Sequence, residues 1–530
     1  MDTLPSWLTP LPDAETMRGV DRWAIEEQGV DGLELMERAG AAVVRALEQM
    51  APDGPVTVLC GKGNNGGDGL VVARLLRQAG RDASVVSISP PDELKGDVRT
   101  NLGRMPGAVP LRIDGSSWDG PPSNGAAEID GDLLARSTVI VDALLGTGFH
   151  GQVREGLADL IEAVNESGTP VLSVDVASGV DASTGVVGGV AVRATRTVTF
   201  HAAKPGHWIN PGKTYSGLLE VASIGIPRGA PMASTIGLIA DSALELLPRR
   251  GADSTKFASG HVIVVGGSVG LTGAPAMASH AALRAGAGYV SAFVPLSAQP
   301  ILASAATPEL MTRGLPEEEG ALSEEGVEQV LEGSARGGAL ALGPGLGRSD
   351  GAASFARRLA AKSELAMVLD ADGLNAHSGR LGELRGRVAP TVLTPHAGEL
   401  GRLLELESAE IERDRLRHVR EAAALSGAIV VLKGDDTLIA DPSGRVAVSA
   451  GGSPALATAG TGDVLTGVIS ALLAQQLDPF AAAAAGVLLH ARAGRLAARR
   501  VGAPEGVIAG DVIEALPGAR AGREGEDGKR

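Results

Sequence analysis

The sequence lacks several features that mark particular classes of protein. A single cysteine, Cys60, stands among 530 residues, which excludes an intrachain disulfide and a zinc site built from thiolates. No apolar run approaches the roughly 20 residues that a membrane span needs. The N-terminal stretch is acidic and interrupted by proline, unlike a secretory signal. We therefore expect a cytoplasmic protein with no membrane partner.

Positive charge is also scarce. Lys and Arg total 47 against 63 Asp and Glu, which gives a formal net charge of −16. The basic clusters are short, as at Arg249–Arg250 and Arg499–Arg500. A chain this acidic repels a phosphate backbone unless a local basic patch offsets the repulsion. We expect small-molecule ligands and no nucleic-acid partner.

Glycine, in contrast, is abundant. The 74 glycines follow no collagen-like period and stand between apolar β-branched runs such as VIVVGG and TVIVDALLG. This pattern is typical of tight turns between strands and helices. The length predicts two or three domains.

Two series of alternating strands and helices follow one another along the chain. The first opens with a helical pattern over Ala14–Met50, and strands separated by helices predict parallel βαβ units. We predict an α/β fold: a Rossmann-like doubly wound parallel sheet in residues 1–225, a proline-interrupted linker over 226–255, and a second α/β domain in 256–516. The charged, glycine-rich tail 517–530 predicts disorder.

The segment GKGNNGGDG (Gly61–Gly69) lies between a predicted strand and a predicted helix. Its glycines let the backbone approach a ligand closely, and the N–H groups that open the helix point at any anion there. It matches neither the dinucleotide fingerprint nor the P-loop, and an ordinary glycine-rich turn is the alternative. Asp68 suits a phosphate site only if it serves chemistry or a cation.

Two further strand ends in the first half carry polar groups. VIVDALLGTG has Asp142 at its strand end, and VLSVDVASGV has Asp175 and Ser178. In a doubly wound sheet ligands bind outside the carboxyl ends of the strands, so we expect Asn65, Asp142 and Ser178 to meet there. Their oxygen atoms suit K⁺, Mg²⁺ or Ca²⁺ rather than zinc. Helix N-capping is the alternative for each acid taken alone.

ATAGTGDVLTG (Ala457–Gly467) is the strongest motif of the second half. GTGD opens a helix, so the amides of Gly460–Asp463 form an anion hole while the Asp463 carboxylate stands ready to take a proton from a hydroxyl. Phosphoryl transfer needs both features. A glycine loop with Asp463 as a plain N-terminal helix residue is the alternative.

Other strand ends in the second half also suit a nucleotide site. Lys433 ends one strand and is followed by Thr437, a pair that suits the phosphates or the base edge of a nucleotide. His396 and Glu399 follow another strand, where a lone histidine is more often structural than catalytic. Two more glycine-rich turns follow strands, Thr272–Ala278 and Gly343–Gly347.

Together, GKGNNGGDG, DALLGTG and DVASGVDASTG resemble the signature segments of NAD(P)H-hydrate epimerases, over most of residues 14–224. The resemblance implies that Asp175 is catalytic and that Asn65, Asp142 and Ser178 bind K⁺. The chain departs from the family at Ala177, where proline is usual, so we expect a less rigid loop around Ser178. The implied substrate-binding residues are Asn64, Asn65, Gly66, Gly67, Asp68, Gly146, Thr147, Gly148, Phe149, His150, Gly151, Gln152 and Asp175.

The segments of the second half, in this order, are similar to the ADP-dependent NAD(P)H-hydrate dehydratases, a ribokinase-like family, over roughly Lys256–Leu516. The resemblance implies that Asp463 is the catalytic base. The implied contacts with the hydrate are Ala274, Gly345, His396 and Asp463, and those with the adenine nucleotide are Lys433, Gly434, Asp435, Asp436, Thr437 and Gly462. The pairing of both halves is typical of bifunctional NAD(P)H-hydrate repair enzymes.

The two resemblances imply a cofactor-repair enzyme. Its first half would interconvert the R and S hydrates NADHX and NADPHX. Its second half would phosphorylate the C6 hydroxyl of the S form with ADP and Mg²⁺, after which loss of phosphate restores NADH or NADPH and leaves AMP. The alternatives are a ribokinase-like small-molecule kinase, whose product is a stable phosphoester, and a first half that only binds or senses a nucleotide. We also expect a homo-oligomer.

Overall fold

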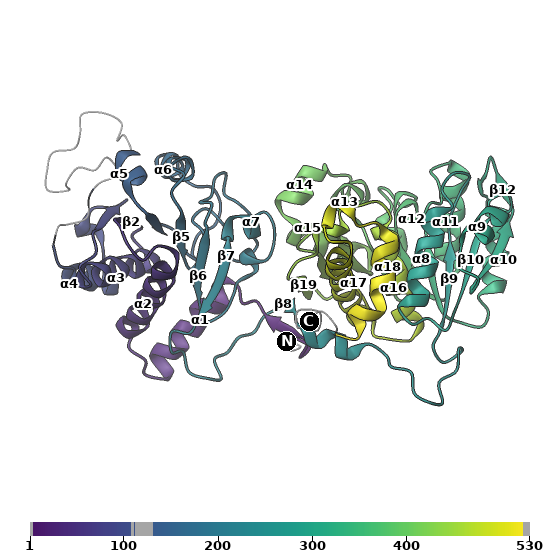
Figure 1. Ribbon diagram of the computed structural model, residues 1–530, viewed down its shortest axis with the longest axis horizontal. Helices are drawn as coiled ribbons and strands as arrows, with labels where there is room; N and C mark the ends of the chain where they lie inside the picture. Colours follow the sequence, from purple (N-terminus) through teal and green to yellow (C-terminus); the bar gives the residue numbers. More distant parts are fainter. Residues whose placement is uncertain (1–3, 108–110, 112–130, 523–530) are drawn as a thin grey trace. The chain divides into compact units, whose positions relative to one another are not determined.

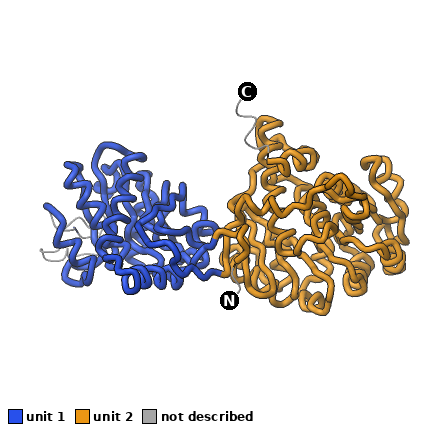
Figure 2. The backbone as a smooth tube through the Cα atoms, turned by 90° about the horizontal axis from the view of Figure 1, so that it is seen from below, with its two compact units in different colours: residues 1–3, 10–234 blue, residues 4–9, 235–530 orange. Residues whose placement is uncertain are grey.

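The computed structural model describes residues 4–107, 111 and 131–522. These residues form two compact units, the first within residues 10–234 and the second made of residues 4–9 and 235–522 (Figure 2). The predicted α/β class is confirmed in both. Within the described ranges, no helix combines the length and the apolar character needed to cross a bilayer.

Unit 1 is built on a six-stranded parallel sheet in the order β3-β2-β4-β5-β6-β7 (Figure 1). Its central strands β2, β4 and β5 are buried along their whole length, as expected where both faces of a sheet are covered. The strands are β2 (Val56–Cys60), β3 (Ala83–Ser87), β4 (Val139–Ala143), β5 (Val171–Val174), β6 (Arg196–Phe200) and β7 (Leu218–Ala222). The helices are α1 (Ala14–Arg22), α2 (Gly32–Met50), α3 (Asn64–Gln78), α4 (Gly96–Arg104), α5 (Gly131–Arg136), α6 (Glu155–Glu166) and α7 (Gly212–Ser216).

Helices cover both faces of this sheet, which confirms the doubly wound arrangement. Val58 of β2 and Val141 of β4 pack with α2 and α3 in one core. Leu59 and Ile140, one position along, pack with α5 and α6 in another. The two cores follow from the alternation of side chains along a strand. The strand order reverses between β2 and β4, and such switch points are where open α/β sheets bind ligands.

Unit 2 is built on an eleven-stranded sheet in the order β1-β8-β19-β18-β17-β16-β15-β14-β9-β10-β11. The strands from β17 to β11 pair in parallel, and β18 is antiparallel to both of its neighbours. The strands are β1 (Leu8–Pro10), β8 (Ile236–Ile239), β9 (His261–Val265), β10 (Tyr289–Pro295), β11 (Leu310–Leu315), β14 (Ala339–Leu342), β15 (Ala366–Leu369), β16 (Thr391–Leu393), β17 (Ile429–Leu432), β18 (Leu438–Ala440) and β19 (Val446–Val448), with a separate pair β12 (Glu317–Glu318) and β13 (Ala321–Leu322).

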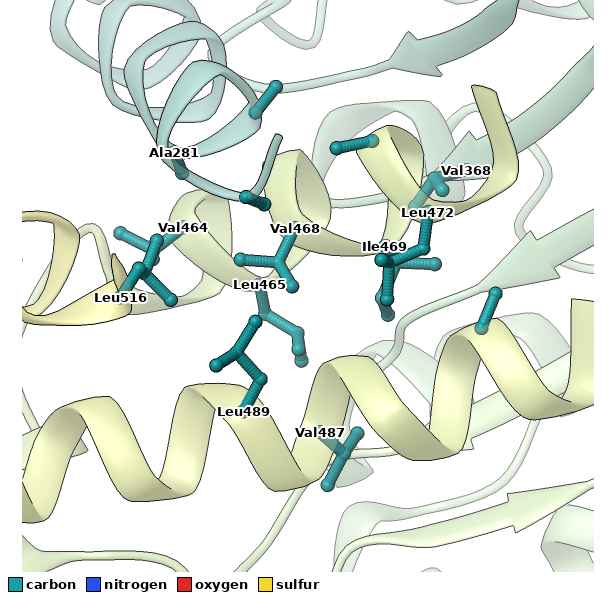
Figure 3. Close-up of a cluster of buried hydrophobic side chains, with 14 of the residues drawn as sticks. Ala281, Val368, Val464, Leu465, Val468, Ile469, Leu472, Val487, Leu489 and Leu516 are labelled. Atoms are coloured by element: carbon teal, nitrogen blue, oxygen red, sulfur yellow. The ribbon is translucent and has the colours of Figure 1, made fainter. Parts of the chain in front are cut away.

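The helices of unit 2 are α8 (Gly273–Arg284), α9 (Gln299–Ala305), α10 (Val327–Gly333), α11 (Asp350–Lys362), α12 (Asp372–Asn375), α13 (Ala397–Leu404), α14 (Ser408–Arg413), α15 (Arg415–Ser426), α16 (Thr461–Ala474), α17 (Pro479–Val501) and α18 (Ala509–Arg520). Helix α16 is surrounded by the main core. Val464 and Val468 of α16 pack with Leu489 of α17, Leu516 of α18 and Ala281 of α8 (Figure 3). A helix that is apolar on all sides is held by its neighbours, so its first turn has a fixed position.

The structure differs from the predicted boundaries in three places. The helix predicted over Ala14–Met50 is interrupted, because a π-helical turn follows α1 and Gly29 adopts a positive φ of 72° before α2. The stretch 226–255, predicted as a linker, contains β8 and a 3-10 helix (Asp241–Leu246). Its residues Ile236 and Ile239 are buried, so these strand positions belong to the second sheet. Helix α18 includes the first residues of the tail predicted to be disordered, and residues 523–530 lie outside the described part.

Candidate active sites

Unit 1 carries a cavity of about 1350 Å³ beyond the carboxyl ends of its strands. Met17 of α1 and Leu35 and Met36 of α2 give it an apolar wall. The predicted substrate-binding residues that line it are Asn64, Asn65, Asp68, Gly146, Thr147, Gly148, Phe149, His150, Gln152 and Asp175. Gly66, Gly67 and Gly151 are not among the lining residues. The size suits a drug-sized ligand or part of a dinucleotide.

The glycine loop after β2 brings its backbone against the next strand end. A Cβ at Gly61 would collide with the carbonyl of Leu144, and one at Gly66 would collide with the carbonyl of Gly61. Gly67 packs against the side chain of Met36, 2.8 Å from the position its own Cβ would take. Close backbone approach is therefore the reason for glycine at Gly61 and Gly66, and α3 begins at Asn64 with its first N–H groups free for an anion.

The structure brings Asn65, Asp142 and Ser178 together around Leu145. The Asn65 Nδ2 donates to the Leu145 carbonyl at 2.9 Å, and the Leu145 N–H donates to Ser178 Oγ at 2.8 Å. Asp142 is fully buried and accepts from Ser178 Oγ at 2.5 Å and from Ser178 N at 2.9 Å. Burial raises the pKa of Asp142, although hydrogen bonds from Ser178 and others oppose that rise. Ser178 is thus held by Asp142 although Ala177 replaces the usual proline.

Asp175 follows β5 and has a partner that the sequence analysis did not single out. Lys204 Nζ donates to Asp175 Oδ1 at 2.6 Å and to Thr199 Oγ1 at 2.7 Å. Both Asp175 and Lys204 line the cavity, together with Asp21 of α1. Lys204 lies shortly after β6, so the rule that sites form at strand ends could have found it. Asp21 lies on a helix distant in sequence and carries no local signal.

In unit 2, Asp463 lies in the first turn of α16. The N-cap residue Gly460 has a φ of 90°, and a Cβ there would lie 2.5 Å from the sulfur of Met277, so glycine is required. Burial, with the nearby charge of Asp370, raises the pKa of Asp463 to about 7, and Lys433 opposes the rise. A carboxyl group with this pKa is suited to general base catalysis near neutral pH.

Lys433 follows β17 and lies beside the start of α16. Its Nζ is 3.0 Å from Asp370 Oδ1 and 3.6 Å from Glu399 Oε2, and a Cβ at Gly462 would be 3.6 Å from the same nitrogen. Burial lowers the pKa of Lys433, but the carboxylates of Asp370 and Glu399 outweigh burial and raise it. Asp370 also accepts from Thr466 Oγ1 at 2.7 Å. Asp370 directly follows β15, so its place at a strand end could have predicted it.

The predicted hydrate contacts of unit 2 come from separate segments. Ala274 and Gly345 are neighbours, since a Cβ at Gly345 would lie 3.3 Å from that of Ala274. His396 is the N-cap of α13, and its Nδ1 accepts from Gly398 N at 3.0 Å. Glu399 Oε2 accepts from His396 N at 2.9 Å, which completes a capping box. His396 therefore caps α13 through Nδ1, and its contact with the hydrate stays a prediction.

Buried Arg415 supports the predicted nucleotide loop from the interior of the protein. Asp436 is 1% exposed and accepts from Arg415 Nε at 3.0 Å, so its carboxylate faces the protein interior. Thr437 Oγ1 donates to the Gly434 carbonyl at 2.7 Å. Asp435 accepts from Gly452 N–H at 3.1 Å. Of the six predicted residues, Lys433 and Gly462 therefore lie at the opening of α16, and Asp436 shapes the loop.

Two family models match this chain in sequence. One, described as NAD(P)H-hydrate dehydratase, matches residues 262–518, and one described as YjeF-related protein N-terminus matches residues 32–206. The bifunctional NAD(P)H-hydrate repair enzyme of Moorella thermoacetica is 41% identical over 96% of each chain. That of Salinibacter ruber is 41% identical over 98% of this chain and 97% of the other. The Escherichia coli enzyme is 34% identical over 95% and 92%.

Among solved structures, the ADP/ATP-dependent NAD(P)H-hydrate dehydratase of Bacillus subtilis, co-crystallised with ATP and Mg²⁺, is 28% identical. It covers 53% of this chain and 96% of that one, with a TM-score of 0.46. Two α/β units, each with a glycine-rich loop and titratable groups at strand ends, define the protein as a two-site enzyme. The chain belongs to the family of bifunctional NAD(P)H-hydrate repair enzymes.

Proposed function

We propose that this chain repairs hydrated NADH and NADPH in two steps, one in each unit. Unit 1 interconverts the R and S hydrates, NADHX and NADPHX, at C6 of the nicotinamide ring. Unit 2 uses ADP to dehydrate the S form and returns NADH or NADPH, AMP and phosphate. Membership of the family supports this reading over a small-molecule kinase fused to a sensing module.

The observation that carries the proposal for unit 2 is the position of Asp463 beside Lys433 at the opening of α16. Asp463 takes the proton of the C6 hydroxyl as that oxygen attacks the β-phosphorus of ADP. The N–H groups of the first turn and the Lys433 ammonium stabilise the charge on the transferring group. The lone pair of the ring nitrogen then expels phosphate, which leaves far more readily than hydroxide. Loss of a proton from C5 to water restores the C5–C6 double bond of NADH or NADPH.

Mg²⁺ fits the charge balance of unit 2. Asp370, Glu399 and Asp463 gather around one ammonium, that of Lys433, and the phosphates of ADP add further negative charge. A divalent cation bound to the phosphates offsets that repulsion. We expect the nucleotide to carry this cation, with Lys433 and Gly462 beside the phosphates.

K⁺ fits the oxygen cluster of unit 1. Asn65, Asp142 and Ser178 offer two neutral oxygens and one carboxylate, a set that suits a monovalent cation. The cation would offset the charge of buried Asp142 beside a phosphate-bearing substrate. Ser178 and Asn65 would hold it against the loop that begins at Leu145.

The expected location and ligands rest on the cysteine content and the net charge. The single, buried Cys60 suits a reducing compartment, so we expect the enzyme in the cytoplasm. We also expect a homo-oligomer whose ligands are the hydrates and ADP, with neither nucleic acid nor membrane as partner, in line with the net charge of −16.

The test is one incubation with product analysis. A mixture of R and S hydrates, ADP, Mg²⁺ and K⁺ should regain all of the reduced-nicotinamide absorbance, and AMP and phosphate should appear in amounts equal to the cofactor restored. A stable phosphoester would instead identify a kinase. Turnover with ATP but not with ADP would keep the kinase-like chemistry and reject ADP as the donor.

A further inference from the structure

The cavity of unit 1 contains more acid and base groups than substrate binding needs. The carboxyl groups of Asp21, Asp68 and Asp175 and the ammonium of Lys204 are among the titratable groups that line this space. Three different elements supply these three acids: α1, α3 and the end of β5. The other titratable lining residues are Arg18, Lys62, Asp97, His150, Arg154, Glu155 and Asp159. Epimerisation needs a group that gives a proton and a group that takes one, so the differences between these carboxyl groups decide their roles.

Asp175 is built to stay ionised. Its Oδ1 accepts from Lys204 Nζ at 2.6 Å and from Thr199 Oγ1 at 2.8 Å. Among the described residues, no hydrogen bond is made to its second oxygen, Oδ2. Burial would raise the pKa of Asp175, but the charge of Lys204 and the hydrogen bonds from Lys204 and Thr199 outweigh burial and lower it. Asp175 has a φ of 63°, a conformation unusual for a side-chain-bearing residue, which the neighbouring bonds maintain.

His207 holds Asp175 and Lys204 in place without taking part in proton transfer. Its Nδ1 accepts from the Lys204 N–H at 3.0 Å, so Nε2 carries the proton and donates to the Asp175 carbonyl at 2.8 Å. Burial, with the charge of Lys204, lowers the pKa of His207 to about 4. A neutral imidazole with both nitrogens engaged is a clamp on the backbone of the two residues.

The surroundings of Asp68, unlike those of Asp175, disfavour the ionised form. Asp68 is 9% exposed, and among the described residues no group donates a hydrogen bond to its carboxyl oxygens. The charges of Asp175 and Asp21 act on it, and both are negative. Burial first, and these two charges second, raise the pKa of Asp68 well above its ordinary value. Its surroundings therefore favour the protonated form of this carboxyl group.

We propose that Asp68 is the general acid and Asp175 the general base of the epimerisation in unit 1, with Lys204 as the positioning residue that keeps Asp175 ionised. The inference rests on the proposed epimerase function of this unit. It assigns one proton donor and one proton acceptor to the cavity and leaves Asp21 to add negative charge.

The assigned groups balance a route through loss and return of water. The lone pair of ring nitrogen N1 forms a double bond to C6 while the C6–O bond breaks, and the leaving oxygen takes the Asp68 proton and becomes water. A water molecule then adds to the other face of C6, the electron pair returns to N1, and the surplus proton passes to Asp175. The intermediate is a cation, which Asp21 and Asp175 favour by charge. Proton exchange with solvent restores the starting state.

The test uses the full-length protein with purified R hydrate, ADP, Mg²⁺ and K⁺, where restoration of cofactor requires epimerisation. Asp68→Asn should slow use of the R hydrate by about 10² or more, to the spontaneous rate. Its use of the S hydrate, which needs unit 2 alone, should equal that of the wild type. Asp132→Asn, an exposed acid on α5 outside the cavity, is the matched control and should behave as wild type. Wild-type use of the R hydrate by Asp68→Asn would overturn the assignment of the acid.

Lys204 is tested by the pH profile, which a purely structural role would not move. In Lys204→Met the low-pH limb of kcat/KM for the R hydrate should shift to higher pH, because Asp175 loses its cation while Asp68, Asp21 and the neutral His207 remain. Lys204→Arg should return the limb toward its original position. An unchanged limb in Lys204→Met overturns the pairing.

The route has its own readout. In ¹⁸O-labelled water each epimerisation should place one labelled oxygen at C6, measured in hydrate that has not been repaired in a sample without ADP. Epimerisation that retains the original oxygen overturns the route through water loss. If the wild type uses the R hydrate no faster than the spontaneous rate, the proposed function fails instead, whatever the variants do.

Discussion

At the scale of single residues, Asp463 has the clearest expected effect. Asp463→Asn should lower ADP-dependent dehydration by about 10² or more while nucleotide binding persists, since the amide keeps the shape and loses the base. Because the pKa of Asp463 is raised to about 7, kcat/KM of the wild type should rise between pH 6 and 8 as the carboxylate forms. Stopped assays with purified S hydrate measure the rate loss of the variant and the pH dependence of kcat/KM in the wild type. The exposed Asp253→Asn is the control, and wild-type turnover in Asp463→Asn would reject the base.

Buried His490 predicts a loss of stability in acid. It lies on α17, and burial first, with the charge of Lys433, lowers its pKa to about 4, against an ordinary value near 6.5. Between these two values the unfolded chain binds more protons, so the free energy of unfolding falls as the pH falls, by about 1.4 kcal/mol per unit for one group. His490→Asn should flatten this slope in denaturant titrations of dehydratase activity from pH 6.5 to 4.5. An identical slope in the variant would contradict the assignment.

Single residues also mark where sequence reasoning reached its limit. Asp142, Ser178 and Asp175 were predictable, because each follows a buried strand and parallel strands end at one edge. Asp21 was not, because it lies on α1, far in sequence from the strand ends, and only the tertiary structure places it in the cavity. The sequence also did not reveal that Asp68 favours its protonated form and Asp175 its ionised form, because this difference depends on Lys204 and on burial. His396 also caps α13, a structural role that its position after a strand did not reveal.

At the scale of elements, the position of β1 was the largest surprise. The chain's first strand joins the edge of the second sheet beside β8 and brings Trp7 into the core of unit 2. Short terminal strands carry little periodicity, and their partner lies more than two hundred residues away. The linker was predicted too long because the sequence of β8 alone does not mark it as a strand. This strand gains its stability from β1 and β19.

This arrangement predicts that the N-terminus stabilises unit 2. Trp7 is 7% exposed, with its ring centroid 5.7 Å from that of Phe480 on α17. Trp7→Ala should lower the unfolding free energy of unit 2 by about 3 kcal/mol, through lost burial and the cavity left behind. Heat inactivation of dehydration should shift to lower temperature, while that of epimerisation stays unchanged. Equal shifts in both activities would show that Trp7 serves the whole chain.

At the scale of the molecule, the two active sites should work independently. Each unit has its own sheet, core and site, so the intermediate S hydrate can leave one chain and enter another. Separate fragments test this poorly, because residues 256–530 alone would lack β1 and β8 and expose the edge of β19. Full-length variants avoid the problem. Asp175→Ala keeps unit 2 intact, and Asp463→Asn keeps unit 1 intact.

A mixture of the two variants should therefore restore cofactor from both the R and the S hydrate, which neither variant does alone. Asp175→Ala by itself should use only the S hydrate, and Asp463→Asn should epimerise without restoring cofactor. Equal amounts of both should consume R and S hydrates completely, at a rate that rises with the concentration of each variant. Omission of K⁺ should slow only the R hydrate if Asn65, Asp142 and Ser178 hold that ion. If the mixture uses no more R hydrate than Asp175→Ala alone, the hydrate must pass between sites within one chain, and the units are not independent.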